Sequence, residues 1–307
     1  MKTIYLHIGT HKTGTTTIQK VLSENQEIIL EKGYYYCQKC RIKYTLGNHP
    51  LAWSILHGDQ MIYAKTGETL DFTTTWKDFL SSIPTSTHNI IISSEYFSLF
   101  DHANILTLKE YLSGFVVMPI IYLRKPDDFL LSLYSENIKS NAYFKSPIKF
   151  FEEQSGRVDY LSMLESWSQV FGHNSIVIDT YKSDTSNTTL INGFFKKIGM
   201  DMSHLDLKIR NPRLNVSPPI KFLKLLRCLN WLFHGRLGIS VAQCRNLYLI
   251  RLLNARMVKV VSLIPDWALS DKWFSEIDKD QLATTFKEMN AKIVVDYLDK
   301  ADAKTFS

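Results

Sequence analysis

GTHKTGTTT, at residues 9–17, is the most informative segment of the sequence. It follows a short β-like run at residues 3–8 and leads into a helical pattern at residues 15–32, with Gly33 as the stop. Two glycines let the backbone turn tightly there, so that successive N–H groups and the helix N-terminus can point at an anion. This order of strand, glycine loop and helix predicts a phosphate-binding loop in an α/β fold.

The lysine of this loop is not where a nucleoside triphosphate site needs it. The spacing Gly-x4-Gly is that of a P-loop, but Thr15 follows the second glycine and the lysine stands earlier, at Lys12. A nucleoside triphosphate site also needs a carboxylate that holds magnesium. A single phosphosulfate group needs less, namely one cation beside the bridging oxygen and no metal. The loop therefore favours a phosphosulfate ligand, and we expect no metal site.

A second motif lies at residues 120–132. The apolar run IIYLRKP at residues 120–126 predicts a buried strand that ends in Arg124, and Pro126 is typical of the first turn of a helix. Ser132 follows Arg124 by eight residues, about two turns into that helix. Open α/β sheets bind ligands at the carboxyl ends of their strands, and an arginine there can hold a phosphate by a bidentate fork. We expect Arg124 and Ser132 to hold one phosphate from two sides.

Both motifs resemble those of the sulfotransferases that use 3′-phosphoadenosine 5′-phosphosulfate (PAPS). HKTGTTTIQ, at residues 11–19, resembles the family's 5′-phosphosulfate loop, PKSGTT or PKTGTT, with His11 in place of proline. The resemblance makes Lys12 the catalytic lysine and Gly14, Thr15 and Thr16 the phosphate-binding residues, with His11, Thr13 and Thr17 in the same loop. It implies a P-loop sulfotransferase-like parallel sheet flanked by helices, with PAPS as the sulfuryl donor.

The second motif resembles the family's 3′-phosphate sequence RDPxxxxxSxY, which places Arg124 and Ser132 on that phosphate; Lys125 replaces the aspartate. NPRLNVS, at residues 211–217, is similar to a loop that precedes the C-terminal helices of bacterial relatives, and Arg213 is a third candidate for the 3′-phosphate. The resemblance extends over residues 3–217 and is strongest at the first two motifs.

Sulfuryl transfer needs a group that takes the proton of the acceptor. Glu95 follows the apolar run at residues 89–94, at the same expected sheet edge as Arg124. Glycan sulfotransferases with a glutamate base carry it near a Tyr-Phe pair, and Tyr-Phe follows Glu95 here, although in a different register. His49, in a turn that leads into a helix, is the second candidate because a histidine pKa suits the task. His7 and His11 are less favoured.

Composition limits the class of protein. The chain has 307 residues and a net charge of +6, and 45% of its residues are hydrophobic, as in a folded globular protein. Between residues 207 and 265 there are eleven basic residues and no acidic one, which favours a polyanionic partner such as an acidic glycan, nucleotide phosphates or an anionic membrane face. The beginning of the chain lacks the pattern of a secretory signal, so we expect a cytoplasmic enzyme, with peripheral contact at the inner membrane face as a further hypothesis.

The four cysteines do not form a disulfide framework, and the Cys37-x-x-Cys40 pair has no second close pair with which to complete a zinc site. We expect reduced structural thiols.

The expected organisation is one domain over residues 1–307. Residues 1–217 would form the PAPS-binding α/β core, with further strands at residues 116–123 and 175–179 and a helix at residues 190–198. Residues 218–307 would be helical, with helices at residues 220–234, 241–261 and 281–298.

Two other functions stay open. One is a small-molecule or sugar kinase with an altered P-loop, for which Asp179 is the candidate metal ligand. The other is a nucleotide-binding subunit without activity, against which the presence of Lys12 speaks. The favoured interpretation is transfer of a sulfuryl group from PAPS to a hydroxyl or amine acceptor, in particular a carbohydrate or glycolipid precursor.

Overall fold

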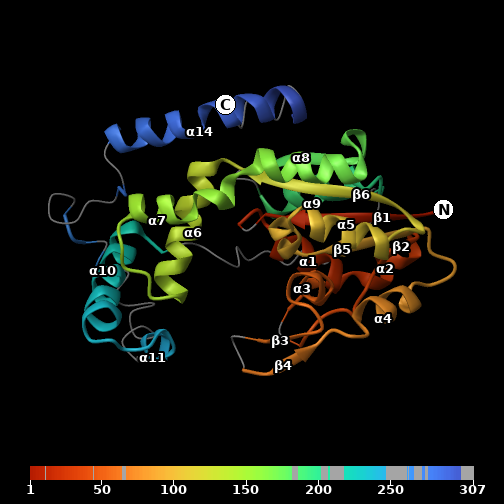
Figure 1. The fold of residues 1–307 in the computed structure, drawn as a ribbon, viewed down its shortest axis with the longest axis horizontal. Helices are drawn as coiled ribbons and strands as arrows, with labels where there is room; N and C mark the ends of the chain where they lie inside the picture. Colours follow the sequence, from red (N-terminus) through yellow and green to blue (C-terminus); the bar gives the residue numbers. More distant parts are fainter. Residues whose placement is uncertain are drawn as a thin grey trace. The chain divides into compact units, whose positions relative to one another are not determined.

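The computed structural model describes residues 1–10, 12–43, 45–63, 67–181, 186–201, 207, 218–246, 261, 263–265, 272–273 and 276–298. The chain divides into two compact units, which are described separately below (Figure 1). The first comprises residues 1–124, 160–213 and 292–307, and the second comprises residues 125–159 and 214–291. The single domain with a division after residue 217 stays a prediction.

A five-stranded parallel sheet, in the order β2-β5-β1-β6-β7, forms the centre of the first unit. Its strands are β1 (Lys2–Gly9), β2 (Tyr34–Tyr36), β5 (Asn89–Ser93), β6 (Phe115–Arg124) and β7 (Val177–Tyr181). β1 is central and pairs with β5 on one side and β6 on the other, with His7 opposite both Ser93 and Ile120. A separate antiparallel hairpin consists of β3 (Gln60–Ile62) and β4 (Thr69–Asp71). The parallel α/β class expected from the sequence is confirmed.

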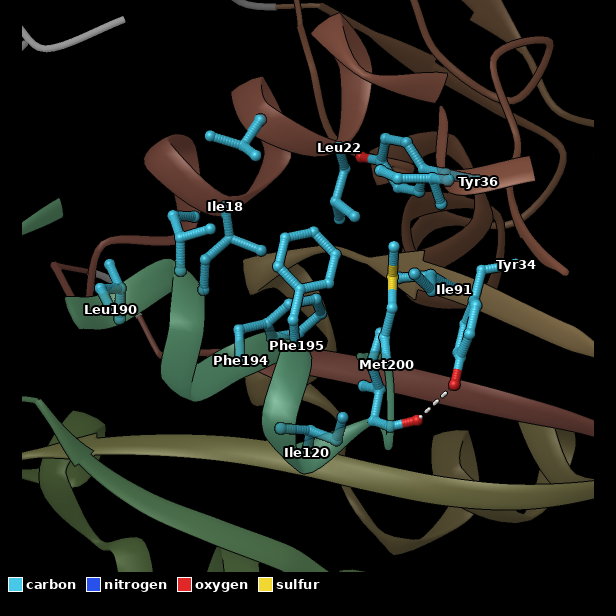
Figure 2. Packing of buried hydrophobic residues seen from close by; sticks show 14 of the residues in the cluster. Ile18, Leu22, Tyr34, Tyr36, Ile91, Ile120, Leu190, Phe194, Phe195 and Met200 are labelled. Atoms are coloured by element: carbon cyan, nitrogen blue, oxygen red, sulfur yellow. Dashed lines mark hydrogen bonds between the residues drawn. The ribbon is translucent and has the colours of Figure 1, made fainter. Parts of the chain in front are cut away.

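Helices cover the sheet because its strands are apolar on both faces. One face packs on α1, α2 and α9, whose apolar side chains meet Ile91, Ile120 and Tyr122 of the strands. Figure 2 shows Phe194 and Phe195 of α9 facing Ile18 and Leu22 of α1 above β6. α8 packs on β6, and α5 packs against α8. The helices and 3-10 segments of the first unit are α1 (Thr15–Glu24), α2 (Gln26–Glu31), α3 (His49–His57), α4 (Thr75–Ser82), η1 (Glu95–Leu99), α5 (His102–Tyr111), α8 (Tyr160–Phe171), η3 (His173–Ser175) and α9 (Asn187–Lys197).

The second unit is helical in the part of it that the structure describes. Asn230 joins α10 to α6 by donating from Nδ2 to the carbonyl oxygen of Ile138 at 2.8 Å. Its elements are α6 (Pro126–Ser140), α7 (Pro147–Gln154), the 3-10 segment η2 (Ser155–Val158), α10 (Ile220–Asn230), the π-helical segment η4 (Trp231–Arg236) and α11 (Val241–Asn246). A last helix, α14 (Glu276–Tyr297), begins in the second unit and ends in the first. No helix among the described residues is long and apolar enough to cross a membrane.

Several predicted boundaries need correction. The single helix expected at residues 15–32 is two helices, because the chain breaks at Asn25, whose side-chain amide turns back to the carbonyl of Val21 at 2.8 Å. The strand expected at residues 175–179 begins at Val177, after a 3-10 turn at His173–Ser175. The helix expected at residues 220–234 changes to π-helical hydrogen bonding at Trp231. Residues 247–260 of the helix expected at 241–261 lie outside the described part.

Candidate active site

The loop between β1 and α1 is held in an unusual backbone conformation. Gly14, the N-cap of α1, is left-handed with φ 80°, and Lys12 has φ 66° although it carries a side chain. Two hydroxyls fix the loop: Thr10 Oγ1 donates to the Tyr122 carbonyl at 2.8 Å, and Thr13 Oγ1 donates to the Thr10 carbonyl at 2.6 Å. Left-handed conformations of residues other than glycine cost free energy and persist where the surroundings impose them, often at ligand sites.

Donors gather where α1 begins. The first turn of an α-helix leaves its amide N–H groups without an acceptor inside the helix, which makes this end suitable for an anion. The amides of Thr17 and Ile18 bond back to the Gly14 carbonyl, at 2.9 and 3.2 Å. The buried Thr15 hydroxyl has no hydrogen-bond partner among the described residues, and the Nε of Arg124 has none either. The amides at the start of α1, the Thr15 hydroxyl and the Arg124 guanidinium at the end of β6 are donors that fit a phosphate or phosphosulfate ligand.

Arg124 brings the second motif to this loop. It ends β6, next to β1 in the sheet, and its Nη1 donates to the Lys12 carbonyl at 3.1 Å. Its guanidinium carbon lies 5.8 Å from the centre of the Tyr181 ring, at the end of β7. Lys12 and Arg124 are 112 residues apart in the chain, and the parallel register puts them at one edge of the sheet. The structure therefore brings one residue of each motif together at this edge.

The other residues that the sequence predicts to bind PAPS differ in their exposure and in the unit to which they belong. Thr13 is buried with its hydroxyl engaged, Thr16 is exposed, and Thr17 is partly exposed. Ser132 is partly exposed on α6 in the second unit. His11 and Arg213 lie outside the described residues.

Both candidate bases lie at the β5 side of the same edge. Glu95 opens η1 directly after Ser94, whose hydroxyl accepts from the Tyr96 amide at 3.2 Å. His49 begins α3, as expected, and its Nδ1 lies 2.9 Å from the Ser94 hydroxyl and 3.8 Å from Glu95 Oε2. Glu95 is partly exposed, whereas His49 is buried against Tyr96, with the two ring centres 5.2 Å apart. Glu95 is therefore the more accessible of the two to an acceptor.

A buried network joins Glu95 to the sheet. Gln19 of α1 donates from Nε2 toward Glu95 Oε2 at 3.3 Å and toward the Ser93 hydroxyl at 3.2 Å. His7 Nδ1 lies 2.8 Å from that same hydroxyl. Burial lowers the pKa of His7 to about 4, although the charge of Glu95 acts in the opposite direction. The neutral imidazole can therefore remain inside, while Gln19 fixes the carboxylate of Glu95.

Sequence reasoning missed this network. Gln19 is the last residue of the stretch HKTGTTTIQ, and a glutamine among apolar helix positions is the feature that could have indicated a buried partner. Asn48 was also missed. Its backbone N–H donates to the Ser93 carbonyl at 2.8 Å, and its side-chain Oδ1 accepts from the backbone N–H of Ser93 at 3.1 Å. Asn48 thereby fixes the start of α3 beside the end of β5.

The kinase hypothesis depends on Asp179, which the structure places on β7. Its Oδ2 lies 3.5 Å from the ammonium of Lys197, and its Oδ1 accepts from the Thr180 amide at 2.8 Å. Both carboxylate oxygens are therefore engaged with protein groups. Among the described residues, no group of three or more histidine, cysteine, aspartate or glutamate side chains is arranged to hold a metal ion.

Comparison with known proteins gives distant similarities. No family model matches the chain. A protein of unknown function from Archaeoglobus fulgidus is 28% identical over 141 residues, which are 45% of this chain and 36% of that protein. The chain thus matches about a third of the length of this curated relative.

Two solved structures align with the fold at low identity. A sulfotransferase from Alicyclobacillus acidocaldarius has a TM-score of 0.45 and 11% identity, over 78% of this chain and 98% of the other. Mouse sulfotransferase SULT7A1, solved in complex with PAP, has a TM-score of 0.38 and 13% identity, over 86% of this chain and 89% of the other. Similarities of this size assign no family, so the function proposed below depends on the residues and geometry of this chain.

Proposed function

We propose that this protein is a sulfotransferase that moves a sulfuryl group from PAPS to a hydroxyl or amine acceptor. The single observation that carries the proposal is the meeting of Lys12 and Arg124 at the carboxyl edge of the sheet. Each residue belongs to a motif that resembles one of the two phosphate motifs of PAPS-dependent sulfotransferases. The unpartnered Thr15 hydroxyl and Arg124 Nε support an anionic ligand at this edge.

The residues divide the work by position. In the reaction, a bond forms between the acceptor oxygen or nitrogen and sulfur, the bond from sulfur to the donor phosphate breaks, and the acceptor proton passes to a base. Lys12 would stabilise the negative charge that develops on the leaving phosphate. Arg124 and Ser132, with Arg213, would hold the 3′-phosphate, and Thr15, Thr16 and the first amides of α1 would hold the 5′-phosphate.

Glu95 would take the acceptor proton, with His49 as the alternative base. Glu95 is at the same edge as Lys12 but on the β5 side, it is partly exposed, and Gln19 orients it through a hydrogen bond of 3.3 Å. His49 is buried and has the Ser94 hydroxyl as a close neighbour. A general base must reach the proton that it abstracts, and accessibility favours the glutamate.

The proposal also names an acceptor class and a cellular location for the enzyme. The likeness of the Glu95 segment to glycan sulfotransferases and the acid-free basic stretch at residues 207–265 favour a carbohydrate or glycolipid precursor on the cytoplasmic side. Contact with an anionic membrane face is less supported. Lys221 donates to the Ile264 carbonyl at 2.6 Å and Lys224 to the Lys272 carbonyl at 2.7 Å, so two of the basic side chains of α10 already serve internal bonds.

A thermal-shift experiment tests the donor. Adenosine 3′,5′-bisphosphate without any metal should raise the melting temperature, because a ligand that binds only the folded state stabilises it by about 2.7 kcal/mol at a hundred times its dissociation constant. Arg124→Ala should remove most of this shift. A shift that requires ATP with magnesium, and that the bisphosphate does not give, would replace the proposal by the kinase hypothesis.

A further inference from the structure

The Cys37-x-x-Cys40 pair takes no part in the proposed reaction. It follows β2 directly, and both side chains are buried, with exposed fractions of 0% for Cys37 and 4% for Cys40. Both are free thiols, and their sulfur atoms lie 3.1 Å apart, within hydrogen-bond distance. Because the two sulfur atoms are this close, on residues three apart, the two cysteines can act together chemically as well as pack in the core.

The turn between the two cysteines is at the surface. Gln38 and Lys39 are exposed while the cysteines on either side of them point inward. A disulfide has a sulfur–sulfur distance of about 2.05 Å, so the two sulfurs need to approach by about 1 Å. Rotation of the two side chains within an exposed turn can supply this movement without moving β2, and a small oxidant needs only a local opening of the turn to reach them.

The two thiols differ in acidity. A hydrogen bond with Cys40 lowers the pKa of Cys37 to about 5 and outweighs burial, which acts in the opposite direction. The same bond, together with burial, raises the pKa of Cys40. The Ser82 hydroxyl, 3.4 Å from the Cys37 sulfur, also favours a thiolate at Cys37. Such an asymmetric pair contains an attacking thiolate and a second thiol that can resolve a mixed disulfide.

We propose that Cys37 and Cys40 form a reversible intramolecular disulfide, which makes this turn an oxidant-sensitive modification site. With a small disulfide such as oxidised glutathione as the oxidant, the Cys37 thiolate attacks one of its sulfurs and the first glutathione leaves as a thiolate. Cys40 then loses its proton, attacks the Cys37 sulfur and displaces the second glutathione. Two protein thiols are oxidised, one glutathione disulfide is reduced to two thiols, and the protons of the cysteines pass to the products.

Zinc binding is the competing role of such a pair. Zinc in a structural site requires four ligands, and no cluster of three or more candidate ligands occurs in the described part of the chain. The geometry therefore favours oxidation of the pair.

Peptide mapping of the native full-length chain tests the proposal. The reduced protein is incubated in glutathione buffers of increasing oxidation, quenched with acid, alkylated and digested with trypsin. Because Lys39 lies between the two cysteines, cleavage after it leaves peptides that only a disulfide can hold together. We expect this linked pair, a loss of two of the four titratable thiols, and recovery of both on addition of dithiothreitol.

Variants provide the controls. Cys37→Ser and Cys40→Ser should each abolish the linked peptides, whereas Cys228→Ser, which removes the exposed cysteine of α10, should leave them unchanged. The wild-type map remains decisive if a serine variant fails to fold. The proposal is overturned if the linkage forms only after denaturation, if glutathione stays attached to Cys37 without resolution by Cys40, or if the native protein retains zinc on this pair.

Discussion

The two sides of β1 present functional groups at the carboxyl edge of the sheet in different ways. On the β6 side, the backbone conformation of the loop shapes the site: Lys12 and Gly14 are left-handed, and Arg124 holds the Lys12 carbonyl by a hydrogen bond. Toward β5, side chains make it, since Gln19 holds Glu95 through a buried hydrogen-bond network. A backbone-built site depends on conformation, and a side-chain network depends on burial and on the satisfaction of every polar group. The two sides should therefore fail in different ways when they are mutated.

The largest effect is expected on the β5 side. Glu95→Gln keeps the shape and removes the proton acceptor, so kcat should fall by about a hundredfold to ten-thousandfold, the usual contribution of a general base. Affinity for adenosine bisphosphate should stay unchanged. Steady-state kinetics and calorimetric titration measure these quantities.

His49→Ala is the matched test of the second candidate base. If Glu95→Gln keeps most of its activity and His49→Ala abolishes turnover without loss of the bisphosphate, then histidine is the base. Loss of bisphosphate binding in Glu95→Gln would show that the two sides of β1 do not act separately.

On the β6 side, Lys12→Ala should lower kcat by about a hundredfold or more, as removal of one donor to a developing oxyanion does. Arg124→Ala should chiefly raise the KM for PAPS, because its phosphate is remote from the reacting bond. Lys20→Ala is the control for loss of a lysine near the loop: Lys20 lies on α1, with its ammonium 3.9 Å from Glu24 Oε1. Unchanged PAPS affinity in Arg124→Ala would contradict the 3′-phosphate assignment.

Local sequence could predict the β6 side because its elements are contiguous. The loop at residues 9–17 and the strand that ends at Arg124 each contain their own pattern, and the alternation of strands and helices predicts that the strands run parallel. Glu95 and His49 on the β5 side could be named as candidate bases, but the network that holds Glu95 could not be predicted in this way. His7, Gln19, Asn48 and Ser93 lie in separate segments, and each polar residue alone is compatible with an ordinary exposed or capping role. Only the tertiary packing makes them partners.

Acid should destabilise the β5 side through His7. Its folded pKa of about 4 lies below the ordinary 6.5, so below pH 6.5 the unfolded chain binds the proton and the folded chain does not. The free energy of unfolding should therefore fall as the pH drops from 6.5 to 4, by about 3 kcal/mol at 1.36 kcal/mol per pKa unit. Urea unfolding across this range measures the slope.

His7→Gln should remove this part of the slope even if the variant is less stable at every pH. His57→Gln, which changes an exposed histidine at the end of α3, should leave the slope as it is. Equal slopes for wild type and His7→Gln would mean that His7 is protonated in the folded protein.

The smallest expected effect distinguishes two costs of placing a side chain at Gly14, that of the left-handed backbone conformation and that of steric overlap with Leu190. Gly14 and Gly33 have almost the same left-handed φ, 80° and 82°, but a Cβ on Gly14 would overlap Leu190 Cδ2, whereas one on Gly33 meets nothing within 4 Å. Gly33→Ala should cost about 1–2 kcal/mol, the penalty of a left-handed residue with a side chain. Gly14→Ala should cost about 1 kcal/mol more, because Leu190 must give way.

Thermal or urea unfolding of both variants measures this difference, and the double variant Gly14→Ala/Leu190→Ala identifies its origin. Shortening Leu190 removes the overlapping methyl group and leaves the 3.1 Å approach to Tyr181 Cε2, so Gly14→Ala should cost less in the Leu190→Ala background than in the wild type. Binding of adenosine bisphosphate should be weakened by Gly14→Ala and left intact by Gly33→Ala, since only the former changes the loop that begins α1. Equal binding by the two variants would mean that the left-handed Gly14 serves only the packing of α1 on α9.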